Sequence, residues 1–377
     1  MYYISKITPK KSGRFYLFKG HFMNSSNSKW FIVSGAALGA LGALLVYFGN
    51  PGNMGVCAAC FLRDTAGALG FHRAGVVQYV RPEIIGLILG GFLASVLWTK
   101  EFSATTGSSP FVRFFLGFFA MIGCLVFLGC PWRAFLRLGG GDMTAIAGVV
   151  GIFAGVCAGV FFKKLGYGLT HEAKTQTAIG VLPTVMGILL LAALALGLKL
   201  GENGALFTSA KGPGSMHAPI LISLGFSVVV GALMHKSKFC SVGAFGRLFK
   251  GDFSMFTGII SIVVFASIVN LALGQYKFGF EGQPIAHNDV LWNFLSMTLA
   301  GLCFSLGEGC PGKHLVQMGT GNLSSVIFVI GMAAGAAVAH NFLLASSPSA
   351  ITAAAPWAVA MGFVFAVYVG FFHKKAA

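Results

Sequence analysis

Long apolar stretches separated by short polar segments extend over almost the whole chain. The stretches are about 17 to 23 residues long, the length that an α-helix needs to cross a lipid bilayer. Inside a bilayer every backbone polar group must be satisfied within the protein, and stretches of this length do so as helices. The sequence therefore predicts an all-α polytopic membrane protein with about ten transmembrane helices. The expected spans are residues 30–48, 82–98, 111–129, 143–162, 178–199, 217–234, 253–274, 290–308, 322–344 and 351–372.

A Gly-Cys-Pro step occurs twice, each time at the end of a long apolar stretch. The two copies are centred on Cys130 and Cys310, which lie 180 residues apart. Proline fits the first turn of a helix, so each cysteine is predicted to be the N-cap of a new helix, with its sulfur beside free backbone N–H groups. Both helices should be short, because glycine-containing segments follow at residues 139–142 and 319–322. The sequence thus predicts two half-length helices whose positive ends carry a thiol.

A second pair of similar segments surrounds Cys57 and Cys240, which lie 183 residues apart. Each half of the chain then contains a helix, a short cysteine segment, two helices, a Gly-Cys-Pro half-helix and a further helix. One intervening span reverses the second copy relative to the first. We therefore expect two inverted repeats, each with short re-entrant half-helices that carry cysteine, which is a pattern typical of transporters.

This repeat divides the chain into five expected regions. A basic cytoplasmic tail precedes the first repeat, and a linker with one spanning helix joins the first repeat to the second. The last region is a final helix with a basic C-terminus. In order, these regions are residues 1–29, 30–162, 163–216, 217–344 and 345–377.

The formal net charge of +16 arises from basic residues in short loops and at the termini. Basic residues in such places orient membrane helices, so the charge does not indicate nucleic-acid binding. Their distribution predicts an inner-membrane protein with both termini in the cytoplasm. Several arginines fall on the expected outer side and break this rule, which segments dipping into the membrane would explain. These exceptions are Arg63, Arg73, Arg81, Arg133 and Arg137.

The cysteines at the two kinds of short segment are the main candidates for chemistry. A neutral thiol is a soft, polarizable contact that donates a weak hydrogen bond to an anion. We therefore expect Cys57, Cys130, Cys310 and Cys240 to form a column of thiols that suits a soft anion containing sulfur or selenium. The sequence predicts no cofactor and no metal site. The other helix-embedded cysteines, Cys124, Cys157 and Cys303, are expected to be packing residues.

Two cations and one acid lie close to the Gly-Cys-Pro cysteines. Arg133 and Lys313 each follow their cysteine by three residues. Either they draw anions toward the thiols, or they extend to the membrane interface. Glu308 is a candidate proton site, although a solvated helix end explains it equally well.

At these residues the chain resembles the YeeE/YedE family of sulfur-transport membrane proteins, from about residue 30 to 372. The stretch from Gly129 to Asp142 is similar to the selenium-associated YedE branch rather than the thiosulfate-carrying YeeE branch. The resemblance differs at Cys60, where the family usually has glycine, and at Gly312, where the branch often has a larger residue. Both differences concern the width of the pore and the identity of the substrate.

This resemblance implies an inner-membrane permease with two pseudo-symmetric halves and short inserted helices. It implies that thiosulfate passes along thiols at the positions of Cys57, Cys130 and Cys310, with a weaker role for Cys240. It also implies a small soluble TusA-like sulfur carrier protein as a partner at the cytoplasmic face.

Our principal hypothesis is therefore an importer of a selenium- or sulfur-containing anion, with the lipid bilayer as its environment. One alternative is a membrane-embedded thiol oxidoreductase that uses Cys57 and Cys60, and another is a scaffold that anchors a soluble partner. The chain contains no Walker A motif, so its sequence gives no support for direct coupling to ATP.

Overall fold

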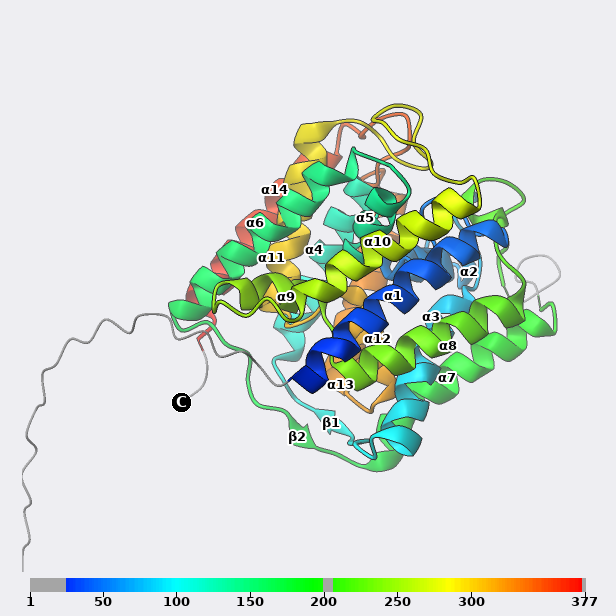
Figure 1. Ribbon diagram of the computed structural model, residues 1–377. Coiled ribbons are helices and arrows are strands. Elements are labelled where there is room, and N and C mark those ends of the chain that lie inside the picture. The colour runs from blue at the N-terminus through cyan, green and yellow to red at the C-terminus, as the bar shows by residue number, and fades with distance from the viewer. Residues whose placement is uncertain (1–24, 199–205, 375–377) are drawn as a thin grey trace, which may run out of the picture.

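The computed structural model is all-helical apart from one small two-stranded sheet (Figure 1). It describes residues 25–198 and 206–374; most of the expected basic tail, residues 1–24, lies outside the described residues. The strands β1 (Thr105–Thr106) and β2 (Ala173–Lys174) pair in antiparallel register. The α-helices are α1 (Ser25–Tyr47), α2 (Ala58–Ala68), α3 (Pro82–Leu93), α4 (Pro110–Phe127), α5 (Pro131–Gly139), α6 (Ala145–Lys164), α7 (Thr177–Ala195), α8 (Ile220–Ser237), α9 (Ser241–Leu248), α10 (Phe256–Ala272), α11 (Val290–Leu306), α12 (Pro311–Gly319), α13 (Leu323–Asn341) and α14 (Ala355–Phe372).

Eight helices in the described part of the chain are long and apolar enough to cross a membrane. The prediction of a multi-pass, all-helical membrane protein is therefore confirmed. The expected number of about ten spans is confirmed only for eight. The other two expected spans fall on shorter apolar helices, Pro82–Trp98, whose last turn is a π-helix, and Phe256–Ala272.

Four pairs of helices from distant parts of the chain pack side by side in the same direction. These pairs are α1 with α10, α3 with α8, α4 with α13, and α6 with α11, and Figure 1 shows α1 lying along α10. Glycines allow the close approach, because Gly35 faces the backbone of Gly258 and Gly39, one turn later, faces Ile262. Small residues at helix interfaces are the usual means of close packing in membrane proteins.

The short helices α2, α5, α9 and α12 lie among these long helices and contribute much of the buried core. All residues of α2 are buried, and most residues of α5 and α12 are buried as well. The helical frame therefore holds the beginnings of short helices inside the protein, where water cannot satisfy their free N–H groups.

Four of the arginines expected on the outer side are buried rather than exposed in loops, and three of these four form ion pairs. Arg63 and Arg81 both form ion pairs with Asp64, at 2.6 and 2.8 Å. Arg137 pairs with Asp142 at 2.7 Å, and both side chains are fully buried. The orientation rule concerns residues in loops, so these internal charges do not contradict it. Arg73 is exposed.

The glycine contacts between the helices predict a clear difference between two Gly→Ala substitutions. A Cβ at Gly155 in α6 would overlap the backbone of Thr298 and Leu302 in α11, whereas a Cβ at Gly225 in α8 meets nothing within 4 Å. Gly155→Ala should therefore lower the melting temperature of the detergent-purified protein by several degrees, because overpacking costs about 1–3 kcal/mol. Gly225→Ala should leave it unchanged or raise it, since alanine favours the helix by up to ~1 kcal/mol. Equal melting temperatures for the two variants would contradict the described packing.

Candidate functional site

All four candidate cysteines are the N-cap residues of the short helices. Cys57 begins α2, Cys130 begins α5, Cys240 begins α9 and Cys310 begins α12. The N-cap positions predicted for Cys130 and Cys310 from the Gly-Cys-Pro step are thus confirmed. Each sulfur lies at the end of a helix where the backbone N–H groups carry partial positive charge.

The same backbone turn precedes each of the four cysteines. The residue two positions before each cysteine has a positive φ, between 42° and 68°. Glycine takes this conformation at one site, and ordinary residues, which rarely adopt it, take it at the other three. These residues are Gly55, Leu128, Lys238 and Glu308. At each site the next helix begins three residues after the residue with positive φ.

The cysteines of the short cysteine segments and those of the Gly-Cys-Pro steps differ in whether the sulfur accepts a hydrogen bond from its own helix. Cys57 accepts a hydrogen bond from the N–H of Cys60 at 3.3 Å, and Cys240 accepts one from Gly243 at 3.4 Å. Cys130 and Cys310, each followed by proline, make no side-chain cap hydrogen bond. Their sulfurs are therefore not engaged in holding the helix end.

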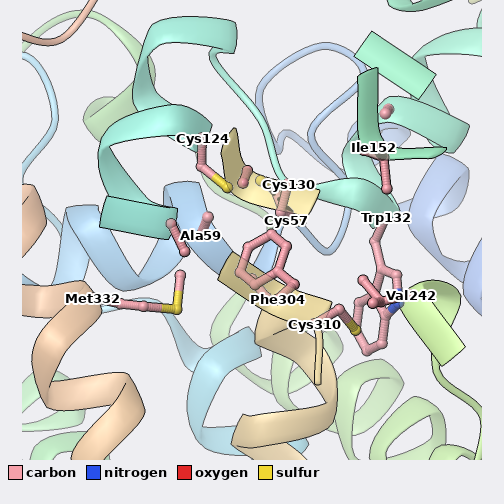
Figure 2. Packing of buried hydrophobic residues seen from close by; sticks show 14 of the residues in the cluster. Cys57, Ala59, Cys124, Cys130, Trp132, Ile152, Val242, Phe304, Cys310 and Met332 are labelled. Atoms are coloured by element: carbon pink, nitrogen blue, oxygen red, sulfur yellow. Dashed lines mark hydrogen bonds between the residues drawn. The ribbon is translucent and has the colours of Figure 1, made fainter. Parts of the chain in front are cut away.

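The structure brings the four thiols together as two pairs. The Sγ atoms of Cys57 and Cys130 lie 3.7 Å apart, and the thiols of Cys240 and Cys310 lie close enough to interact. Figure 2 shows Cys57 beside Cys130, with the ring of Phe304 between this pair and Cys310. All eight cysteines are free thiols. Each pair thus combines one cysteine from a short cysteine segment with one from a Gly-Cys-Pro step.

A cavity of about 920 Å³ reaches the second pair. Cys240 forms part of its wall, together with Val242, Phe304 and Val316. Six cationic side chains line it against two carboxylates. The cations are Lys163, Lys164, Lys238, Arg247, Lys250 and Lys313, and the carboxylates are Glu101 and Glu308. A cavity with this excess of positive charge attracts anions.

Both carboxylates of the cavity have cationic partners. Glu101 lies 2.6 Å from the Lys238 ammonium, whose hydrogen bond and charge lower the pKa of Glu101. Glu308 pairs with Arg113 at 3.1 Å and is about half exposed. The two acids are therefore already paired and leave most of the lysines in the cavity available to an anion.

Arg133 and Lys313 occupy equivalent sequence positions but different surroundings. Arg133 is fully buried, and its guanidinium donates to the carbonyl oxygens of Pro284 and Ile285 at 3.3 and 3.0 Å. It also lies 4.0 Å from the sulfur of Cys60. Arg133 is therefore covered by the chain and not exposed at the protein surface. Lys313 lines the cavity, with its Nζ donating to the backbone oxygen of Glu308 at 2.6 Å.

Sequence reasoning missed most of the cavity. It assigned Lys163, Lys164 and residues 235–250 to helix orientation, because they are basic and lie near helix ends. The folded chain brings these segments to one place, beside Cys240. For residues 235–250 the available signal was their proximity in sequence to Cys240, whereas Lys163 and Lys164 approach it only through folding.

The second half of the chain has a recognisable relationship to known proteins. Residues 236–371 match the sulphur transport family. The matched domain contains both cysteines of the second pair and the cationic residues from Lys238 to Lys313. A search of curated proteins gives no match to this chain. The resemblance found in the sequence is thus confirmed for this domain at the level of the sulphur transport family.

The geometry of the site predicts which thiols react with an aqueous reagent. Cys240 faces the cavity, whereas Cys57 and Cys303 are fully buried and do not line it. An anionic methanethiosulfonate, applied to the purified protein, should modify Cys240 at least about tenfold faster than Cys57 or Cys303, since thiol reactivity requires access. Mass spectrometry of the digested protein reports all three thiols in one sample. Equal modification of the three would contradict the described cavity.

Proposed function

We propose that this protein is a membrane transporter that imports a sulfur- or selenium-containing anion along its cysteine thiols. The match of residues 236–371 to the sulphur transport family supports the transporter class and a sulfur substrate. The observation that carries the proposal is the basic cavity that has Cys240 in its wall and Cys310 beside it.

The charge of the cavity supports an anionic substrate. Six cationic side chains around a volume of about 920 Å³ raise the local concentration of small anions. The cavity is large compared with one small oxyanion, so it serves as a vestibule rather than a tight binding site. Tight binding at this point would slow release, and passage through a pore requires both entry and release.

The thiols provide the soft contacts beyond the vestibule. Each thiol lies at a helix N-terminus, where anions are stabilised by backbone N–H groups and the helix dipole. A neutral S–H group adds a weak donor without the repulsion of a thiolate. The substrate would move between the Cys240–Cys310 pair and the Cys57–Cys130 pair, with thiosulfate and selenium anions as candidate substrates.

The selenium-associated branch and a protein partner belong to the same proposal. The similarity of residues 129–142 to the YedE branch supports a selenium substrate such as selenite or selenosulfate. A soluble TusA-like carrier would receive the substrate at the open end of the cavity. We place this end in the cytoplasm, because Lys163, Lys164 and residues 235–250 have the charge expected for that side.

We also propose that residues 30–162 and 217–344 are inverted repeats with re-entrant half-helices. The proposal is supported by reciprocal helix pairs, since α1 packs on α10 as α8 packs on α3, and α6 packs on α11 as α13 packs on α4. The turns are reciprocal as well: Leu128 and Glu308, 180 residues apart, both have positive φ. Asp142 and Asn322, at the same separation, each form a bridge to a loop of the other half, at Gly279 and Thr105.

An inverted repeat explains why one end is open and the other is closed. Lys313 lies in the cavity, whereas its counterpart Arg133 is covered by the loop that contains Pro284 and Ile285. The structure then corresponds to a state open toward the cytoplasm. Exchange of the two environments between the halves would open the outer side.

One observation favours the alternative of a thiol oxidoreductase, although it concerns Cys57 with Cys130 and not the expected pair of Cys57 with Cys60. The 3.7 Å separation of the Cys57 and Cys130 sulfurs would allow a disulfide bond after a small movement, because such a bond is about 2.05 Å long. An oxidoreductase would form and break this bond during turnover. Thiol trapping under transport conditions separates the two functions, since the transporter proposal requires the thiols to stay reduced.

The central test is uptake by cells that carry cysteine variants. Cys130→Ala and Cys310→Ala should each reduce the uptake of radiolabelled thiosulfate and selenite at least about tenfold, because a missing thiol interrupts the series of weak sites. Cys303→Ala, which removes a buried thiol of α11 outside the two pairs, is the matched control. Unchanged uptake in either test variant at normal expression would exclude the thiol pathway.

The vestibule predicts a separate effect of charge on apparent affinity. Lys313→Gln should raise the KM for uptake several-fold and weaken its dependence on ionic strength, since one attracting charge is lost from the cavity. Lys174→Gln, a change at an exposed position of β2 outside the cavity, should leave both quantities unchanged. The comparison requires initial uptake rates at two salt concentrations. The same KM in both variants would show that Lys313 does not act on the substrate.

A further inference from the structure

The two half-helices that follow the Gly-Cys-Pro steps differ at one position in a complementary way. Trp132 follows Pro131 in α5, and Gly312 follows Pro311 in α12. Trp132 is 1% exposed and is the largest of the fully buried side chains. A Cβ placed on Gly312 would overlap three ring atoms of Trp132. The indole therefore reaches from α5 across to α12 and fills the space that a side chain at position 312 would occupy.

This arrangement places the ring between the two thiol pairs. Trp132 lies two residues after Cys130 of the first pair, and the glycine it covers lies two residues after Cys310 of the second pair. In Figure 2 the ring lies beside Cys310 and Val242, and Val242 belongs to the wall of the cavity. The ring therefore joins the beginnings of the two half-helices, each of which carries one thiol of a pair at its N-cap.

The ring also carries an unused hydrogen-bond donor. Trp132 Nε1 is buried and has no hydrogen-bond partner in the structure. Buried tryptophan N–H groups normally find an acceptor, because leaving a donor unpaired away from water is unfavourable. The indole N–H can only donate, so its missing partner must be an acceptor. An oxyanion between the two thiol pairs is such an acceptor.

We propose that Trp132 is the barrier and a specificity-determining residue of the pathway. This inference rests on the proposed function and extends it. The ring closes the passage between the Cys57–Cys130 pair and the cavity, and its N–H donates to an oxygen of the anion as the ring moves aside. The absence of a side chain at Gly312 provides the space in which the ring lies when the passage is closed.

The two roles of the ring make different predictions for two substitutions. Trp132→Phe retains a bulky ring and removes the donor, so it should raise the KM for thiosulfate and selenite about three- to tenfold, as expected for one lost hydrogen bond. It should still exclude benzenesulfonate, an oxyanion too wide to pass a closed ring. Trp132→Ala removes the ring as well, and should admit benzenesulfonate, which the wild-type protein excludes.

The experiment is uptake of the three labelled anions into proteoliposomes that contain the full-length protein. Trp30→Phe, in α1 beside Trp98, is the matched control and should behave like the wild type. Thermal unfolding in detergent checks that each variant is folded. If Trp132→Ala does not fold, Trp132→Phe still tests the donor, and Gly312→Ala, which places a methyl group in the space that the ring occupies when the passage is closed, should admit benzenesulfonate.

The results distinguish this inference from the proposed function. Wild-type uptake with an unchanged KM in Trp132→Phe and continued exclusion of benzenesulfonate by Trp132→Ala would contradict the role of Trp132 alone. Absence of thiosulfate and selenite uptake by the wild-type protein would contradict the proposed function itself, and the role of Trp132 with it. A raised KM in the first variant and passage of benzenesulfonate through the second would support the inference.

Discussion

The four short helices that begin at a cysteine have their N-termini inside the protein, and the rest of the structure depends on how these N-termini are satisfied. A helix that begins away from water leaves its first N–H groups without partners. Here proline removes one of these groups at α5 and α12, and a cysteine sulfur accepts one at α2 and α9. The same groups give these positions their affinity for anions, so the structural requirement and the proposed chemistry have one origin.

The charges of the protein are divided between an enclosed set and an accessible set. Arg63, Arg81 and Arg137 are matched by buried aspartates, whereas the lysines around the cavity have few acidic partners. Breaking a buried pair leaves an uncompensated charge, so the enclosed pairs are costly to separate once the chain has folded. The accessible set can exchange partners at little cost, which suits a surface that meets a substrate transiently.

Much of the fold could be predicted from the sequence because its signals are local. Length and apolarity indicated the spans, and the Gly-Cys-Pro step placed Cys130 and Cys310 at helix N-caps. The arrangement of the thiols as two pairs depends on tertiary packing that no spacing along the chain reveals. The cavity was missed because Lys163 and Lys250 become neighbours of Cys240 only after folding. The contact of Trp132 with Gly312 joins residues 180 positions apart, and neither residue type signals the other.

The glycine contacts of the four long helix pairs have a mechanical consequence. Backbone meets backbone at Gly35, Gly155 and Gly331, with no side chain between that could change its rotamer and let one helix slide past its partner. Each helix pair is therefore expected to move as one rigid unit built from two distant segments of the chain. A large conformational change would then move these units relative to one another. The backbone would change at the short helices and turns where the cysteines lie. The hinge segments of the protein would then be the segments that carry the paired thiols.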